Sequence, residues 1–349
     1  LDDLRPADAG EFTRRAFANG KLDLTEAEGL ADLIGAETEQ QRRLALRQVH
    51  GELKDLYERW RSELVRALAH LEASIDFADE ELPSDLAAGV RPRIDRLTAE
   101  IAAHLEDHRR GEIVRDGFTV VILGAPNVGK SSLLNALARR DAAIVSSIPG
   151  TTRDAVEVDL DLGGYAVTLI DTAGLRETAD EIESEGIRRA RAKAQVADLR
   201  LGVVDLSVDD SRVSEELESG DAVLINKCDL APTHHVPAYR TKNGEPLTAL
   251  RLSAKTGSGI GDLLAWLEAQ VIARAGGSES MPMTRARHRE ALEDAHAALV
   301  RVPRTIDANA IDLAAEDMRI AARALGRITG RVDVEDLLDV IFREFCIGK

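Results

Sequence analysis

A glycine-rich loop between an apolar run and a helical run is the first feature with recognisable chemistry. Gly124-Ala-Pro-Asn-Val-Gly129-Lys130-Ser131 follows the apolar residues 118–123 and leads into Ser132-Leu-Leu-Asn-Ala-Leu. Glycines let successive backbone N–H groups turn towards one point, where they bind phosphate. Lys130 is expected to neutralise the β and γ phosphates, and the Ser131 hydroxyl to ligate Mg²⁺. The loop therefore predicts a nucleoside triphosphate site.

Three further motifs follow in the order that a guanine nucleotide site requires. Asp171-Thr-Ala-Gly174 ends an apolar run, where its carboxylate can hold the metal through water and its glycine N–H can sense the γ-phosphate. Asn226-Lys227-Cys228-Asp229 also ends an apolar run, and the Asp229 carboxylate can accept the ring N–H and amino hydrogens of guanine, which adenine does not offer. Ser253-Ala254-Lys255 fits a loop that closes over the base. Together the four motifs predict GTP as the ligand.

The residues that would drive hydrolysis are less clear from the residue types. Leu175 stands where Ras-like GTPases have the glutamine that orients the attacking water, and leucine forms no hydrogen bond through its side chain. A polar loop over residues 144–154 has the Gly/Pro content of a switch loop, and one of its threonines can complete the Mg²⁺ shell. On charge alone the acidic residues after the motif are a solvated helix start. They are Glu177, Asp180, Glu181, Glu183 and Glu185.

The elements that would position these motifs are short β-rich runs alternating with helical stretches between Asp116 and about Ala275. This alternation predicts an α/β domain with a mostly parallel sheet. Gly163-Gly164 lies between two of the runs and suits a tight hairpin, which predicts one antiparallel strand at the edge of the sheet. The predicted strands are 118–123, 155–162, 166–170, 199–204, 222–225 and 247–252.

Helical patterns flank this region on both sides. From about Thr25 to Arg110, apolar residues recur every three or four positions, most clearly from Leu46 to Ile75, and predict one long amphipathic helix. Pro83 and Pro92 bracket a break, after which a second helix is expected to run back along the first. After the Gly276-Gly277-Ser278 linker, helices are predicted over 285–300, 306–328 and 334–345. We expect the two helical regions to pack together, with the α/β domain inserted between them.

Composition bounds the class of protein. The 349 residues are 44% hydrophobic and 31% charged, as in globular proteins of two or three domains, and no apolar run is long enough to cross a membrane. Two cysteines are too few for a disulfide framework or a structural zinc site, which favours a reducing, cytosolic setting. The net charge of −17 argues against wholesale wrapping of nucleic acid, although a local basic site remains compatible with it. Leu1 is not an initiator Met, so the chain is expected to be a fragment.

Four arginines recur every four residues near the end of the chain, at positions 319, 323, 327 and 331. On a helix they would form one basic ridge, which could contact the backbone of an RNA. Asp312, Glu316 and Asp317 are close enough in the sequence to pair with the ridge instead. Both interpretations stay open from the sequence alone.

The motifs together resemble the MnmE (TrmE) family of bacterial tRNA-modification GTPases. The resemblance covers nearly the whole chain, and its first and last motifs are the most specific. It implies a Ras-like P-loop GTPase domain of α/β class inserted in a discontinuous all-α helical domain. It also implies a preceding folate-binding and dimerisation domain, most of which this chain lacks. The motifs are Gly10-Glu-Phe-Thr-Arg-Arg-Ala-Phe, Asn19-Gly-Lys-Leu-Asp-Leu, the phosphate loop with Asn127, Gly150-Thr-Thr-Arg-Asp, Asp171-Thr-Ala-Gly-Leu-Arg-Glu and Cys346-Ile-Gly-Lys349.

With that resemblance, the chain divides into four expected segments. The first is a remnant of the folate-binding domain with its linker, and the last carries the Cys-Ile-Gly-Lys motif. The segments are the remnant at 1–24, the first helical part at 25–115, the GTPase domain at 116–275 and the second helical part at 276–349.

The resemblance also assigns roles to individual residues. Family members use K⁺ in place of an arginine finger, and an amide oxygen with backbone carbonyls suits that large, weakly hydrated ion. Thr152 joins Ser131 on Mg²⁺, and Glu183 orients the attacking water. The implied K⁺ shell is Asn127, Ser146, Ile148 and Thr151. The implied nucleotide and switch contacts are residues Asn127, Val128, Gly129, Lys130, Ser131, Ser132, Ser146, Ser147, Ile148, Pro149, Gly150, Thr151, Thr152, Asp171, Thr172, Ala173, Gly174, Asn226, Lys227, Asp229, Ser253, Ala254 and Lys255.

A second set of residues points to the folate. Lys21 and Lys349 match positions that contact a reduced folate, 5-formyl- or methylene-tetrahydrofolate, and a cation suits its glutamate tail. Cys346 is placed near that pocket as a second catalytic residue, or else it is a partly buried structural thiol. With the preceding domain missing, the folate site of this chain is expected to be incomplete.

The expected function is that of a K⁺-dependent GTP hydrolase that drives modification of tRNA at C5 of the wobble uridine, with carboxymethylaminomethyl- or aminomethyl-type products. The implied partners are an FAD-containing protein, MnmG (GidA), a second copy of the chain in a heterotetramer with it, and tRNA, in the cytoplasm and away from membranes. A ribosome-assembly GTPase of the Era or double-GTPase type is the alternative. It is disfavoured because no Gly-x-x-Gly loop follows residue 275. A nucleotide-switched scaffold with little turnover also stays open.

Overall fold

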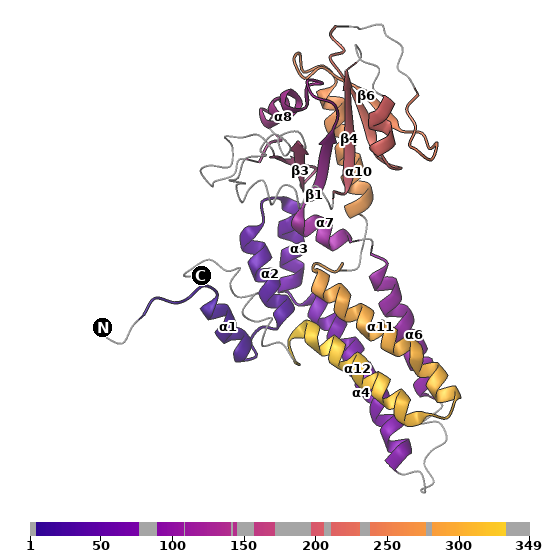
Figure 1. Cartoon of the computed structure of the whole chain (residues 1–349). Helices are drawn as coiled ribbons and strands as arrows, with labels where there is room; N and C mark the ends of the chain where they lie inside the picture. The colour runs from indigo at the N-terminus through magenta and orange to yellow at the C-terminus, as the bar shows by residue number, and fades with distance from the viewer. Residues whose placement is uncertain are drawn as a thin grey trace, which may run out of the picture. The chain divides into compact units, whose positions relative to one another are not determined.

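The computed structural model describes residues 5–76, 89–107, 109–140, 142–144, 157–171, 197–205, 211–230, 238–276 and 281–332. The chain folds into two compact units, and each is described by itself (Figure 1). The helical unit joins Leu1–Ala36, Gln41–Arg115 and Ser278–Lys349. The α/β unit consists of Glu37–Gln40 and Asp116–Gly277. One unit is therefore an insertion in the other.

A six-stranded sheet forms the centre of the α/β unit, with strand order β2-β3-β1-β4-β5-β6. All neighbouring strands are parallel except β2 and β3, which pair antiparallel through a turn at Gly163 and Gly164, both with positive φ. The parallel strands read as continuous apolar runs because both faces are covered, and all five residues of β5 are buried. The strands are β1 Phe118–Leu123, β2 Glu157–Leu162, β3 Tyr165–Asp171, β4 Leu199–Asp205, β5 Ala222–Asn226 and β6 Thr248–Arg251.

Two α-helices of this unit bury one apolar stripe each. Helix α8, Lys130–Ala138, buries Leu133, Leu134 and Leu137, which recur at helical spacing. Helix α10, Ile260–Ala275, likewise buries its residues at positions 260, 263, 267 and 271. A short 3₁₀ helix, η1, spans Ser211–Glu216. Because these strands are parallel, the carboxyl ends of β1, β3, β4 and β5 lie at one edge of the sheet, where Gly124, Asp171 and Asn226 of the sequence motifs fall.

The helical unit has one continuous core formed by α4, α6, α11 and α12 (Figure 1). Helix α12 packs against α11 and α4, and α11 also packs against α6. Tyr57, Leu64, Ile94 and Leu97 are among the largest fully buried side chains of that core. The helices are α1 Glu11–Ala18, α2 Leu24–Gly35, α3 Glu39–Val49, α4 Glu52–Asp76, α6 Val90–Leu105, α7 Arg110–Asp116, α11 Ala286–Asp307 and α12 Ile311–Thr329.

The predicted long helix is wrong, because breaks at residues 36–38 and at Gly51 divide it into α2, α3 and α4. Helix α3 ends at Val49 and α4 begins at Glu52, with Gly51 at φ 86° between them. Residues other than glycine rarely adopt that backbone conformation. The apolar spacing runs through the break without interruption, so periodicity alone could not reveal it.

Two helices of the helical unit contain a proline. Pro92 lies in the first turn of α6, which begins at Val90, and a proline is tolerated there because the first N–H groups of a helix have no partner within it. Helix α11 continues through Pro303 to Asp307, so the predicted end at residue 300 and restart at 306 are wrong. The break lies instead at Ala308–Ala310, where Asn309 has φ 56°. The predicted helix over 334–345 lies outside the described residues.

The predicted architecture of an α/β domain inserted in a discontinuous helical domain is confirmed. The antiparallel edge strand is confirmed as well. Helix α1 belongs to the helical unit, and its assignment to a remnant over residues 1–24 stays a prediction. Over the residues that the structure describes, no helix is long and apolar enough to span a bilayer.

Candidate nucleotide-binding site

The phosphate loop joins the end of β1 to the start of α8 and needs glycine at two positions. Gly124 has φ 144°, and a Cβ there would lie 2.4 Å from the Val203 carbonyl oxygen. Gly129, the N-cap of α8, has φ 102°, and a Cβ there would lie 2.3 Å from Asn226 Nδ2. Both positions combine a left-handed backbone with a close approach, which no other residue accommodates. The unpaired N–H groups and the dipole of α8 then favour an anion at this end of the helix.

Lys130 and Ser131, the first residues of α8, place a cation and a hydroxyl inside this loop. Lys130 is 5% exposed, and its Nζ donates to the carbonyl oxygens of Gly124 and Ala125, both at 2.9 Å. Ser131 Oγ donates to Asp171 Oδ2 at 2.9 Å, at the carboxyl end of β3. The predicted pairing of the phosphate loop with Asp171 is therefore present in the structure.

The hydroxyl and carboxylate oxygens are hard donors of the kind that Mg²⁺ prefers. Within the described part of the chain, no group of three or more His, Cys, Asp or Glu side chains could hold a metal ion. Ser131 and Asp171 offer the one or two protein ligands with which Mg²⁺ is usually bound beside phosphate oxygens and water.

Asn226 connects the phosphate loop to the two loops expected at the base. Its Nδ2 donates to the Val128 carbonyl oxygen at 2.8 Å, and its Oδ1 accepts from the Ala254 N–H at 3.1 Å. The side chain is 2% exposed. It was predicted as a nucleotide contact, and in the structure it positions the loops that would make those contacts.

Lys227 makes a second connection of this kind. Its backbone has φ 60°, and its Nζ donates to the Asn127 carbonyl oxygen at 3.0 Å and to Asp205 Oδ2 at 2.7 Å. Asp205 ends β4, is 8% exposed and was missed by the sequence analysis. It directly follows an apolar run, as Asp171 does, and that shared position was the signal that could have found it.

The remaining described residues of the predicted site lie at the carboxyl edge of the sheet or beside it. Asp229 and Lys255 are exposed, as groups that receive a base must be, while Ser253 is fully buried and its Oγ accepts from the Thr256 N–H at 3.2 Å. Asn127 and Ser132 are exposed on the loop and on the first turn of α8. The selection of guanine by Asp229 stays a prediction.

Several predicted site residues fall elsewhere. Lys21 is exposed in the turn after α1, in the helical unit. The rest lie outside the described residues, so their roles in K⁺, Mg²⁺ and folate binding and in catalysis stay predictions. They are Ser146, Ser147, Ile148, Pro149, Gly150, Thr151, Thr152, Thr172, Ala173, Gly174, Glu183, Cys346 and Lys349.

Comparison with known proteins decides the family. The sequence profile of the MnmE helical domain matches residues 24–346, which is most of the chain. The chain belongs to the MnmE family. The tRNA modification GTPase MnmE of Parvibaculum lavamentivorans is 57% identical over 100% of this chain and 78% of its own length. The MnmE of Paramagnetospirillum magneticum is 55% identical over 99% of this chain and 77% of its own length.

Among solved structures, the FeoB G domain from Methanococcus jannaschii is similar to part of the chain. It is 23% identical with a TM-score of 0.31, and the match covers 44% of this chain and 97% of that one. A likeness of this size supports no conclusion about function. The assignment to the MnmE family depends on the sequence relatives.

Proposed function

We propose that this chain is a GTP hydrolase that acts in the modification of tRNA. The observation that carries the proposal is the constellation of Lys130, Ser131 and Asp171 at the N-terminus of α8, which Asn226 connects to the base loops. The sequence relatives support it, since they are tRNA modification GTPases that match the whole chain.

In the proposed mechanism, this chain's own groups bind and orient the nucleotide. The amides of the phosphate loop and Lys130 bind the β and γ phosphates, and Ser131 with Thr152 would hold Mg²⁺, which would neutralise charge on the phosphate oxygens. Asp171 accepts the hydrogen bond of Ser131 and so fixes the hydroxyl in place. The Asp229 carboxylate would select guanine by accepting hydrogen bonds from the ring N–H and the amino group of the base. Glu183 would orient the attacking water.

A potassium ion is proposed beside the phosphates. Asn127, Ser146, Ile148 and Thr151 would hold it, and when bound it would supply the positive charge that an arginine finger supplies elsewhere. Asn127 fits the role: its side chain is exposed, and Lys227 Nζ fixes its backbone at φ 63° by binding its carbonyl oxygen. An amide oxygen is a suitable ligand for this ion.

The modification itself is proposed to occur at C5 of the wobble uridine, with an aminomethyl- or carboxymethylaminomethyl-type product. The chain would act in the cytoplasm as a homodimer within a heterotetramer that contains the FAD protein MnmG (GidA). A reduced folate would supply the transferred carbon, and GTP hydrolysis would drive conformational change. Lys21, exposed in the turn after α1, is the predicted folate contact among the described residues.

The two alternatives differ in how the nucleotide is used. A ribosome-assembly GTPase is disfavoured because the identity to MnmE relatives extends over the helical unit as well as the α/β unit. A nucleotide-switched scaffold would keep the binding residues and hydrolyse GTP at a negligible rate. Turnover therefore separates the scaffold from the enzyme.

The decisive experiment measures the GTP hydrolysis rate of the chain in K⁺ and in Na⁺ at equal ionic strength. We expect a higher rate in K⁺, and a loss of about 10²–10³-fold in Glu183→Ala and in Lys130→Ala, the range found when one transition-state contact is removed. Glu183→Ala should retain GTP affinity, whereas Lys130→Ala should lose it. A rate that is unchanged by the cation and by Glu183→Ala contradicts the mechanism.

A further inference from the structure

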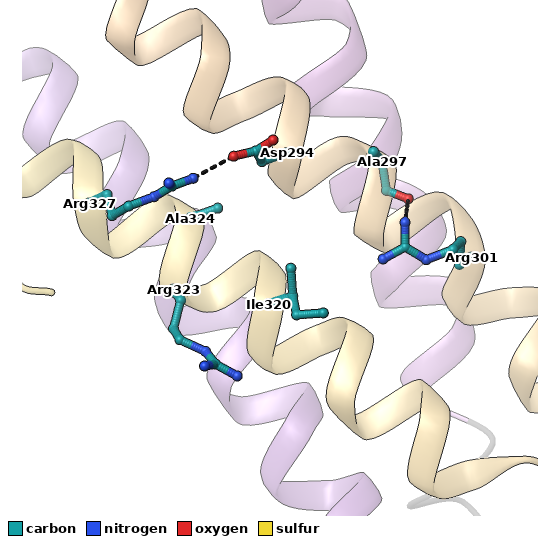
Figure 2. Close-up of a pocket in the computed structure, with 7 residues that line it drawn as sticks. All are labelled: Asp294, Ala297, Arg301, Ile320, Arg323, Ala324 and Arg327. Carbon is teal, nitrogen blue, oxygen red and sulfur yellow. Dashed lines mark hydrogen bonds and ion pairs between the residues drawn. The ribbon is translucent and has the colours of Figure 1, made fainter. Parts of the chain in front are cut away.

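A groove between α11 and α12 of the helical unit is lined by three arginines (Figure 2). Its volume is about 470 Å³. Two small side chains, Ala297 and Ala324, leave room for a ligand to approach the helices, and Ile320 adds a partly exposed apolar surface. The lining residues are Asp294, Ala297, Arg301, Ile320, Arg323, Ala324 and Arg327.

The four arginines of the predicted basic ridge have two different surroundings in the structure. Arg319 pairs with Glu72 of α4 at 2.7 Å and also with Glu316, while Arg331, which follows the end of α12, pairs with Glu58 of α4 at 2.6 Å. These two arginines connect α12 to α4. Arg323 and Arg327 instead line the groove, where Arg301 of α11 joins them. Arg301 was not part of the predicted ridge.

Three hydrogen bonds orient Arg301 in the groove. Its Nε and one terminal nitrogen donate to Asp317 Oδ1 at 2.9 and 2.6 Å, and the other terminal nitrogen donates to the Ala297 carbonyl oxygen at 3.0 Å. Asp317 is buried, whereas the Arg301 side chain is 51% exposed, so the guanidinium is accessible to a ligand. Asp317 was one of three acidic residues close enough in the sequence to pair with the ridge, and in the structure it pairs with Arg301. A guanidinium fixed in this way loses little conformational entropy when it binds a further group.

Among the residues that the structure describes, Arg323 and Arg327 each pair with one acidic side chain. Arg323 contacts Glu316 at 2.9 Å and Arg327 contacts Asp294 at 2.5 Å, and their side chains are 57% and 41% exposed. A guanidinium carries five N–H donors, so one contact leaves donors that can bind an oxyanion. Pairs as exposed as these contribute little to stability and exchange readily with a ligand. Of the three carboxylates that pair with these arginines, only Asp294 lines the groove, while Asp317 and Glu316 lie outside its lining.

We propose that this groove binds the phosphate backbone of the tRNA. Arginine is the residue whose planar fork matches phosphate oxygens, and the two arginines on α12 are spaced by four residues, about 6 Å along the helix. Ile320 lies between the arginines of the two helices and would contact a ribose or base (Figure 2). The inference rests on the proposed function, because it takes the RNA substrate from it and names the surface that holds that substrate.

The test measures the affinity of the whole chain for tRNA at several KCl concentrations by fluorescence anisotropy. The Arg323→Gln/Arg327→Gln variant removes two groove arginines, and Arg319→Gln/Arg331→Gln removes the same charge from the two arginines that bind α4. We expect the groove variant to lose about two units of the slope of log K against log salt, one for each phosphate contact. The control variant should keep the slope of the wild-type chain.

Four results would overturn the inference, and they separate it from the proposed function. Equal losses in both variants would show an effect of net charge alone, and unchanged binding in both would place the RNA elsewhere, while the proposed function stands. A groove variant that binds tRNA normally and fails to bind poly-glutamate, assayed in parallel, would assign the groove to an acidic protein segment. A wild-type chain that does not bind tRNA at any salt concentration would contradict both proposals. Thermal unfolding of each variant verifies that it is folded.

Discussion

The nucleotide site and the buried charges of the helical unit use polar groups in opposite ways. At the nucleotide site, the side chains of Lys130, Asn226 and Lys227 bind backbone carbonyl oxygens of the phosphate loop, so they shape a loop whose surface stays open to a ligand. In the helical unit, Glu28 is fully buried and binds Arg287 through two hydrogen bonds of 2.6 and 2.7 Å. At the nucleotide site the polar side chains fix the conformation of a loop, whereas in the helical unit the buried charges neutralise each other and satisfy each other's hydrogen bonds.

The buried charges, which we call the Glu28 cluster, consist of Glu28, Asp32, Arg115, Arg285, Arg287 and His288. Glu28 and Asp32 belong to α2. Arg115 lies in α7, just before the chain enters the α/β unit, and the other three lie at the start of α11, just after it returns. Two carboxylates of one helix therefore join the segments of the helical unit that precede and follow the insertion.

Removal of Glu28 tests the structural role of the cluster and should have the largest effect. Glu28→Gln leaves Arg287 buried without its carboxylate, and breaking a buried pair in this way costs about 3–5 kcal/mol of the free energy of unfolding. Denaturant unfolding followed by circular dichroism measures the change. The matched control is Glu72→Gln, which removes the exposed partner of Arg319 and should change the stability little. Equal effects of the two substitutions would show that the Glu28 cluster stabilises the fold no more than an exposed ion pair does.

Acidification should disturb the same cluster through His288. Burial, together with the charge of Arg287, lowers the pKa of His288 from 6.5 to about 4, while Glu28 opposes that shift. Burial alone would raise the pKa of Glu28, but Arg287 and His288 lower it by more. The net pKa lies well below its usual value, so the carboxyl stays ionised. The folded state thus contains a neutral imidazole at 3.0 Å from Glu28, and the unfolded chain takes up a proton at pH 6.5.

The sign of the pH effect follows from that difference. The contribution of neutral His288 to the free energy of unfolding is fully present above pH 6.5. It is lost as the pH falls towards 4, by about 3 kcal/mol for a pKa shift of this size. His288→Gln keeps a hydrogen-bond donor near Glu28 and should flatten the dependence of the free energy of unfolding on pH between 7 and 4.5. His50→Gln, at an exposed histidine, should leave the dependence as it is. If both variants keep the wild-type slope, another group causes the acid sensitivity.

The same contrast explains what the sequence could predict. The phosphate loop, Asp171 and Asn226 were found because each lies at a fixed offset from a strand, and β1 was predicted with its correct ends at Phe118 and Leu123. The partners in the Glu28 cluster are 259 and 260 positions apart, so no local pattern connects Glu28 to Arg287 or His288. The break at Gly51 was missed because the apolar spacing continues across it.

Substitution of Asn226 tests whether polar side chains shape the loops of the nucleotide site. Of the predicted effects on free energy, this one is the smallest. Asn226→Ala leaves the buried Val128 carbonyl oxygen and the Ala254 N–H without their side-chain partner. One such group costs about 1–3 kcal/mol, which predicts a loss of about tenfold in affinity for a guanine nucleotide. Calorimetric titration with GDP measures it. Asn19→Ala, which removes an exposed amide bonded to the Arg15 carbonyl oxygen, is the control and should leave GDP affinity unchanged. A loss of thermal stability in Asn226→Ala without any loss of affinity would mean that the loops keep their shape without Asn226, and that the α/β unit uses this amide as the helical unit uses Glu28.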